Sequence, residues 1–273
     1  MDMGRPITQR VVIKIGGALI DEDTALDALF EQINCLRTQG VEVILVHGGG
    51  PQASMLSHRL GIEPVKVGGR RITDADTLEV VQMVYGGLLQ TRLVAAARRK
   101  GLAAVGISGV DGRLIEATRR PPLTVEGQAV DFGWVGEIKQ VRPQIIETLL
   151  HTGFLPVVSP LAGNDAGEVF NINADTLAAN LALALQADAL VFVLQTGGVL
   201  TDLQDKESIV PALDQGEAQV GIQEGWIHTG MQPKLTAGFK AVKEGVPAVW
   251  IAAVQELAAV VTHKKGKGTR LTC

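Results

Sequence analysis

The stretch VVIKIGGALI, residues 11–20, surrounds one charge with β-branched residues and then follows it with two glycines. Val and Ile favour β-strands, so Lys14 is expected in a buried strand that ends at Gly16 and Gly17. Ligands of open α/β sheets bind at the carboxyl ends of the strands. The stretch therefore predicts one wall of an anion site, because glycine lets backbone N–H groups approach a ligand closely.

The rest of the chain alternates between strands and helices. Apolar strands are predicted at VVIKI, VEVILV, AAVGIS, FLPVVS, ALVFVLQT and PAVWIA. Helical patterns run over about 21–40, 74–100, 143–153 and 232–244, and others begin near 175 and 254. This alternation predicts an α/β fold, a three-layer αβα sandwich with a mostly parallel central sheet. Residues 112–137 interrupt the rhythm with a predicted hairpin, and turn formers at 161–170 suggest lobes of residues 1–170 and 171–273 on one continuous sheet.

Composition excludes several classes of protein. The chain has 273 residues, is 46% hydrophobic and carries a net charge of −4. Its one basic tract is HKKGK at 263–267, so no nucleic acid partner is expected. The first ten residues lack the apolar core of a signal peptide, and polar residues interrupt the longest apolar stretch, 177–194. We therefore expect a cytoplasmic protein without a membrane span.

Glycines also end two further predicted strands, at Gly48 to Gly50 and at Gly197 and Gly198. Each group alone is equally compatible with a tight turn between strand and helix. Three such loops, one of them next to Lys14, favour a phosphate site. The sequence contains neither a G-x-x-x-x-G-K-[ST] nor a G-x-G-x-x-G pattern, so a P-loop and a dinucleotide fold are both disfavoured.

Two other segments carry candidate polar residues. GMQPKL places Lys234 in the first turns of a predicted helix, where a lysine can equally face solvent. NINADTLAAN places Asp175 at a helix start, with Asn171 and Asn173 before it. Asn and Asp at such positions are also good helix caps, so capping remains open as their role.

Seven motifs in order resemble the amino acid kinase family, and within it the N-acetylglutamate kinases. They are KIGGAL, VHGGGPQ, GRRITDADTLEVVQMV, VGISGVDG, GWVGEI, NINADTLAANLA and GMQPK, spread over about residues 11 to 270. The resemblance implies that ATP, accompanied by Mg²⁺, phosphorylates the side-chain carboxylate of N-acetyl-L-glutamate. The product is an acyl phosphate used in arginine biosynthesis.

Two alternative functions are also compatible with the sequence. MVYGGL, residues 83–88, is similar to kinases whose aminoadipate or glutamate substrate is tethered to an amino-group carrier protein. NINAD, at 171–175, departs from their N-I-D-G-D. The other alternative is a catalytically weak member of the family with a regulatory role.

The resemblance also implies roles for individual residues. The residues expected to be catalytic are Lys14, Lys234 and Asp175, the aspartate orienting both lysines. Acceptor binding is expected from Gly49, Gly50, Arg71 and Asn171, with Arg71 gripping the α-carboxylate and Arg70 as its competitor. Nucleotide and phosphate contacts are expected from Lys14, Gly16, Gly17, Gln195, Gly198 and Lys234. No protein ligand to a metal is expected.

Two residues depart from the family pattern. Gln195 stands where an aspartate is usual, and Gln90 stands in LLQTRL where relatives have V-N-K. Glutamine keeps a hydrogen-bonding group but loses the charge of aspartate, which leaves activity open. From the same resemblance we expect a homodimer that forms through the 74–100 helix and an edge of the sheet.

Overall fold

The computed structural model describes residues 9–68, 70–125, 127–263 and 266–273. The segment in which no signal peptide was expected therefore lies mostly outside the described residues, as do the two adjacent lysines of HKKGK. No helix in the described ranges is long and apolar enough to cross a membrane.

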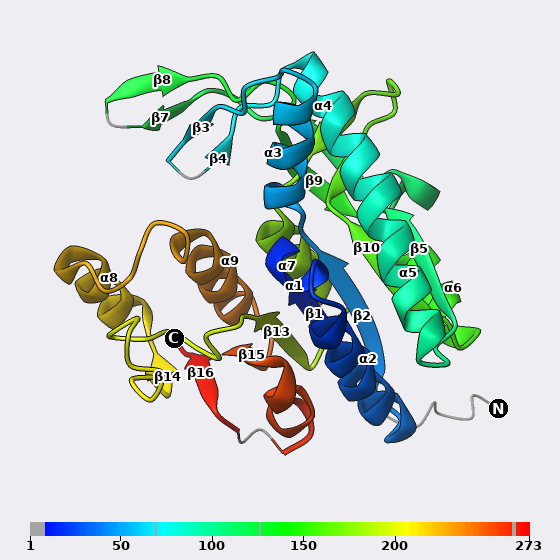
Figure 1. The fold of residues 1–273 in the computed structure, drawn as a ribbon, viewed down its shortest axis with the longest axis vertical. Helices are drawn as coiled ribbons and strands as arrows, with labels where there is room; N and C mark the ends of the chain where they lie inside the picture. The colour runs from blue at the N-terminus through cyan, green and yellow to red at the C-terminus, as the bar shows by residue number, and fades with distance from the viewer. Residues whose placement is uncertain (1–8, 69, 126, 264–265) are drawn as a thin grey trace.

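An eight-stranded sheet forms the centre of the molecule (Figure 1). Its strands are β1 (Arg10–Ile15), β2 (Glu42–His47), β5 (Ala104–Ser108), β10 (Leu155–Ser159), β13 (Ala189–Val193), β14 (Ala212–Leu213), β15 (Ala248–Ala252) and β16 (Gly268–Leu271). They lie in the order β14-β16-β15-β13-β1-β2-β10-β5, and only the β15–β16 pair is antiparallel among the pairings described. The predicted α/β fold with a mostly parallel sheet is confirmed.

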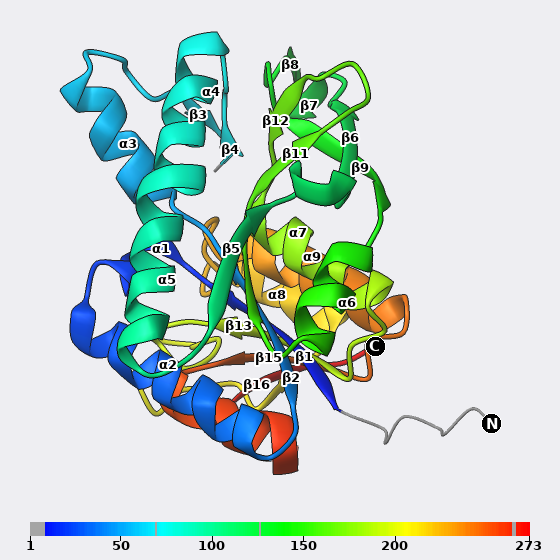
Figure 2. The same cartoon turned by 90° about the vertical axis from the view of Figure 1, so that its right-hand side faces the viewer.

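Helices cover both faces of the sheet, which makes three layers (Figure 2). One face carries α2 (Asp23–Thr38), α4 (Ala75–Gln82) and α5 (Gln90–Arg99), and the other carries α6 (Gln144–His151), α7 (Ala174–Ala184) and α9 (Gln232–Lys243). Side chains of a strand alternate between faces. Val11, Ile13 and Ile15 accordingly enter the first core, and Val12 enters the second.

The predicted helix over 74–100 is not uniform. Between α4 and α5, residues Met83–Leu89 form a π-helical segment, η1. Such segments insert an extra residue per turn and often lie at functional sites. The predicted last helix, from 254, is a 3-10 turn, η3 (Val254–Glu256), followed by a second π-helical segment, η4 (Ala259–His263).

Several elements were not predicted. They are α1 (Gly17–Ile20), α3 (Gly50–Arg59), α8 (Gln215–Glu224), the 3-10 turn η2 (Asp111–Arg113), the strands β14 and β16, and most of the short strands described next. A four-stranded sheet of β6 (Ile115–Arg119), β9 (Gly136–Val141), β11 (Leu161–Gly163) and β12 (Val169–Asn171) stands beside the central sheet. Two hairpins extend from this end of the molecule in Figure 1, β3–β4 (Lys66–Val67 and Arg70–Arg71) and the predicted β7–β8 (Leu123–Val125 and Gln128–Val130).

Thr73 ties the β3–β4 hairpin to the smaller sheet. Its N–H donates to the Phe132 carbonyl at 3.0 Å, and its carbonyl accepts from the Trp134 N–H at 2.6 Å. The side-chain amide of Asn171 donates to Thr73 Oγ1 at 3.1 Å, and Thr73 is fully buried. Arg71, two residues before Thr73, is thereby fixed relative to Asn171.

Gly133→Ala tests this junction. Gly133 has φ 68°, and a Cβ there would lie 2.3 Å from the Thr73 carbonyl oxygen. We expect Gly133→Ala to lower the free energy of unfolding by more than the ~1–3 kcal/mol of backbone strain alone. Gly101→Ala is the control, because Gly101 has φ 77° but open space around it. Equal losses in urea denaturation would show that the Thr73 contact is dispensable.

Candidate active site

The carboxyl ends of β1, β2 and β10 and the N-termini of α1, α3 and α7 surround a cavity of about 480 Å³. Eight of the predicted site residues line it, namely Lys14, Gly16, Gly17, Gly49, Gly50, Arg71, Asn171 and Asp175. Helix N-termini carry partial positive charge and unpaired N–H groups. The cavity is therefore suited to anions, as the glycine loops predicted.

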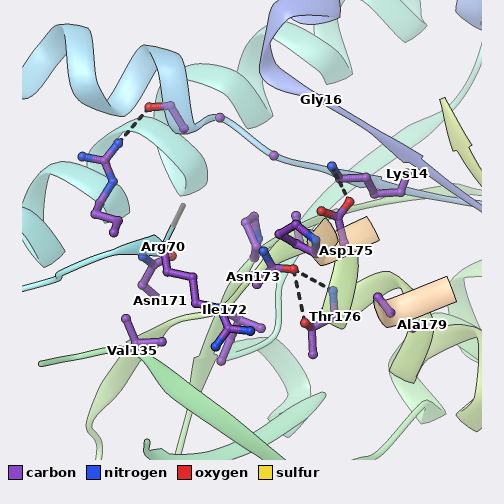
Figure 3. Close-up of a pocket in the computed structure, with 18 of the residues that line it drawn as sticks. Lys14, Gly16, Arg70, Val135, Asn171, Ile172, Asn173, Asp175, Thr176 and Ala179 are labelled. Carbon is purple, nitrogen blue, oxygen red and sulfur yellow. Dashed lines mark hydrogen bonds and ion pairs between the residues drawn. The ribbon is translucent and has the colours of Figure 1, made fainter. Parts of the chain in front are cut away.

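Strand alternation explains the position of Lys14. It follows Ile13 on β1 and shares the face of Val12, which is the face covered by α7. Its Nζ lies 2.7 Å from Asp175 Oδ1 in the first turn of α7 (Figure 3). Both side chains are buried, so each charge depends on the other for its compensation.

Asp175 also approaches the second predicted lysine. Its other oxygen, Oδ2, lies 3.7 Å from Lys234 Nζ at the start of α9. Lys234 does not line the cavity. Its ion-pair partner Asp175 and its chain neighbour Pro233 both line it. Burial lowers the pKa of Lys234, and Asp175 counteracts part of that shift. One carboxylate thus positions two ammonium groups, one with each oxygen.

The first two glycine loops contain positions where a side chain would not fit and positions where one would. A Cβ on Gly49 would lie 2.3 Å from Leu89 Cδ1 and 2.8 Å from the Tyr85 ring. A Cβ on Gly17 would lie 2.4 Å from Oε1 of Gln52, whose side-chain amide donates to the Gly17 carbonyl. Gly16 and Gly50 have open space around them. Gly17 and Gly49 are therefore required by packing, while Gly16 and Gly50 leave room for a ligand.

Arg71 is held by one nitrogen and leaves another unused. Its Nη2 donates to the Gly50 carbonyl at 2.9 Å and to Ser54 Oγ at 2.6 Å. Its Nη1 is buried and has no hydrogen-bond partner. Leaving a buried donor unsatisfied costs about 1–3 kcal/mol. This nitrogen is therefore suited to an oxygen of a bound carboxylate.

Asn173 and Asn171 have different roles in the structure. Asn173 caps α7, because its side chain accepts from the Thr176 N–H at 2.9 Å. Asn171 lies on β12 with its amide donating to Thr73, and it lines the cavity near Arg70 and Ile172 (Figure 3). Asn173 is therefore the helix cap, a role that the sequence left open for both asparagines, while Asn171 faces the cavity.

The remaining predicted residues lie elsewhere. Gln195, after β13, is exposed and donates to Glu22 Oε1 at 3.1 Å. Gly198 is buried, and a Cβ there would lie 2.7 Å from Ile209 and 3.0 Å from Thr269. Neither lines the cavity described above, so their nucleotide contacts stay predictions. Gln90 is buried and connects Ile107, Val157 and His47 by hydrogen bonds, which is a packing role.

Sequence reasoning did not find several cavity residues. Cations from three separate segments line it beside the predicted ones, namely Lys66, Arg70, Arg120 and Lys240. The sequence indicates Arg70 only as a competitor of Arg71. Arg120 and Lys240 lie in segments without a recognisable motif, so no local signal marked them.

A sequence model described as the amino acid kinase family matches residues 9–253. The chain belongs to the amino acid kinase family. Relatives include acetylglutamate kinases from Methanopyrus kandleri, 42% identical over 86% of this chain and 91% of the relative, and from Bacteroides fragilis, 40% identical over 95% of each.

Solved structures of the family agree on the fold. A Streptococcus mutans protein, smu.665, has a TM-score of 0.78 at 26% identity and covers 90% of this chain and 95% of that one. Carbamate kinase from Giardia lamblia bound to AMP-PNP has a TM-score of 0.67 at 15% identity, covering 97% of this chain and 99% of that one. The second likeness is one of fold alone.

The shared carboxylate predicts a pH effect on kinase activity. Lys234 is charged below its pKa, and Asp175 raises that pKa against the effect of burial. In Asp175→Asn the pKa of Lys234 falls further, so the alkaline decline of kcat is expected at lower pH than in the unmodified enzyme. Asp175→Glu keeps the charge and should keep the decline near its original pH. An unshifted decline in Asp175→Asn would mean that activity does not depend on the charge of Lys234.

Proposed function

We propose that this protein transfers the γ-phosphoryl group of ATP to the side-chain carboxylate of N-acetyl-L-glutamate, a step of arginine biosynthesis. One observation carries the proposal: Asp175 positions two lysines at one end of a cavity whose other wall holds Arg71 with a free, buried guanidinium nitrogen. That arrangement suits an acceptor with two carboxylates, one reacting and one held. The names of the relatives agree with it.

The reaction needs charge stabilisation more than proton transfer. A carboxylate is already ionised near pH 7, so its oxygen can attack the γ-phosphorus directly. A new P–O bond forms to the acceptor, the bond from the γ-phosphorus to the bridging oxygen breaks, and ADP leaves. Negative charge on the transferring oxygens is then neutralised by positioned cations and N–H donors. Lys14, Lys234 and the amides of Gly16 and Gly50 supply these.

Each side chain has a place in this scheme. Lys14 acts between the β- and γ-phosphate oxygens, and Lys234 acts on the leaving side. Asp175 keeps both lysines oriented. Arg71 and Asn171 bind the α-carboxylate, which places the side-chain carboxylate of the acceptor toward Lys14. Gln195 and Gly198, beyond this cavity, belong to the nucleotide end of the site.

The two lobes follow from the same assignment. Arg71 and the first two glycine loops come from residues 1–170, which we assign to acceptor binding and dimer contacts. Lys234 and the loop after β13 come from residues 171–273, which we assign to ATP. Pairing of β1 with β13 makes the sheet continuous between them, with Lys14 on the shared strand.

Mg²⁺ enters with the nucleotide in this proposal. No three His, Cys, Asp or Glu side chains come together to hold a metal within the described part of the chain. Asp175, the carboxylate that lines the cavity, is already engaged by two lysines. Mg²⁺ commonly keeps several waters and binds through substrate phosphates. The ion would supply further neutralisation of phosphate charge.

A hydroxamate assay tests the proposal. Hydroxylamine traps acyl phosphates, so the protein with ATP, Mg²⁺ and N-acetyl-L-glutamate should form a hydroxamate. Lys14→Ala and Lys234→Ala should each lower kcat by about 10²–10³ with a smaller change in KM, as expected for groups acting on the transition state. Lys206→Ala, on an exposed loop, is the control and should retain activity. Absence of hydroxamate with every N-acylated glutamate would refute the proposed function.

We further propose a cytoplasmic homodimer, formed through η1 and the edge strand β5. Met83 and Leu88 on η1 are large apolar side chains that are 51% and 60% exposed, so both are accessible to a partner. β5 ends the sheet with β10 as its neighbour, so its outer edge is open to pairing. Gly86 of η1 and Gly106 and Ser108 of β5 line one surface pocket, so η1 lies beside the edge strand, which supports a second copy as the occupant.

Sedimentation equilibrium tests the dimer. The unmodified protein should sediment as a dimer, and Leu88→Asp should shift it toward monomer because a charge would be buried at the interface. Leu203→Asp provides a matched control, since Leu203 is 58% exposed on a turn outside η1 and β5. A monomer in the unmodified protein, or equal effects of both variants, would contradict this interface.

A further inference from the structure

Two arginines that line the cavity form no ion pair with any carboxylate of the described residues. Arg70 comes from β4, and Arg120 follows β6, so two distant segments bring their guanidinium groups to one wall. Among the residues that the structure describes, neither group has an ion pair or a side-chain hydrogen bond. The exposed Lys66 lines the same region from β3. Unpaired cations that converge on a cavity indicate an anionic group on its ligand.

The electrostatic surroundings support this interpretation. Partial burial lowers the pKa of Arg120, and the charge of Arg70 lowers it further. Glu137 is the carboxylate that opposes this shift, but it is hydrogen-bonded to Lys139 at 2.9 Å. Holding two like charges close together costs free energy. A bound anion between Arg70 and Arg120 would offset that cost.

N-acetyl-L-glutamate does not supply such an anion. One of its carboxylates reacts near Lys14, and Arg71 takes the other in the proposed function. Arg70 and Arg71 are adjacent on β4, so their side chains leave the strand on opposite sides. Arg71 is buried against α3 and Arg70 is exposed in the cavity mouth. Arg70 therefore serves a different part of the ligand.

The same wall contains apolar residues. Val135 and Ile172 line the cavity, and Figure 3 shows them beside Arg70 and Asn171. Ile172 is 3% exposed and belongs to the second core. An acyl arm on the acceptor nitrogen would contact both these apolar residues and the guanidinium groups that line the same cavity. This combination of apolar and charged contacts matches an aliphatic chain that ends in a carboxylate.

We propose that the preferred acceptor is an N-acyl-L-glutamate whose acyl arm itself ends in a carboxylate, bound by Arg70 and Arg120, and that acetyl is the poorer arm. The inference rests on the proposed function, because the phosphorylated group remains the side-chain carboxylate of glutamate. It assigns Arg70 and Arg120 to substrate specificity and leaves the lysines and Asp175 in their roles. The enzyme that precedes it would then join a dicarboxylic acid unit to the glutamate nitrogen.

Three acceptors compared in the hydroxamate assay test the inference. They are N-acetyl-L-glutamate, N-succinyl-L-glutamate and the succinyl compound with its terminal carboxylate replaced by a carboxamide. The carboxamide keeps the length of the arm and removes its charge. We expect kcat/KM for the succinyl compound to exceed the values for both others by tenfold or more. Comparable kcat/KM for all three would overturn the inference and leave the proposed phosphoryl transfer intact.

Variants assign the effect to the two arginines. Arg70→Gln and Arg120→Gln should each lower kcat/KM for the succinyl compound by tenfold or more, with less than about threefold change for the acetyl and carboxamide compounds. Arg71→Lys should lower all three alike, because the α-carboxylate is common to them. Arg59→Ala, an exposed cation at the end of α3, should change none. Equal losses for charged and uncharged arms in Arg70→Gln and Arg120→Gln would overturn the assignment, whereas no product from any acceptor would instead refute the proposed function.

Discussion

The buried ion pair between Lys14 and Asp175 is the constraint on which the rest of the site depends. A buried charge is tolerated only with a partner at short range, and this pair spans a central strand and the helix that covers it. The pair requires the N-terminus of α7 to lie at the carboxyl end of β1. It also requires the face of the sheet under α7 to be polar at Lys14. Lys234 then joins the same carboxylate from α9. Three elements that are distant in the sequence are thereby fixed at one place.

The cavity holds more positive than negative charge, and that imbalance carries a cost for the empty protein. Among the described residues, six cationic side chains line it, namely Lys14, Lys66, Arg70, Arg71, Arg120 and Lys240, against the one carboxylate of Asp175. Repulsion among them, together with the unsatisfied Nη1 of Arg71, opposes folding. Anionic ligands remove both penalties, so ligand binding is coupled to stability. Strain at a site that is offset elsewhere in the fold is common in functional proteins.

In the proposed function, phosphoryl transfer and acceptor choice occupy different parts of the architecture. The lysines, Asp175 and the glycine loops lie at the ends of the central strands, where the core fixes them. Arg70, Arg71 and Arg120 lie in segments outside the central sheet, and the hydrogen bonds of Thr73 hold the β3–β4 hairpin to the smaller sheet. Under this assignment, a change in one of these segments alters which acyl group is accepted without moving the phosphoryl-transfer groups. This separation is typical of folds that place variable segments on a rigid scaffold.

The sequence by itself determined the alternation of strands and helices, the glycine loops and the lysine within β1, because hydrophobic periodicity and side-chain-free turns are local properties. It also indicated Asp175, Arg71 and Lys234 through motifs. It did not reveal η1, α3, the small sheet or the pairing of β16, since each is stabilised by contacts with distant residues. The distances between Asp175 and its two lysines follow only from the packing of α7 and α9 on β1. Arg120 shares a wall with Arg70 for the same reason: segments far apart in the chain meet only once the tertiary fold brings them together.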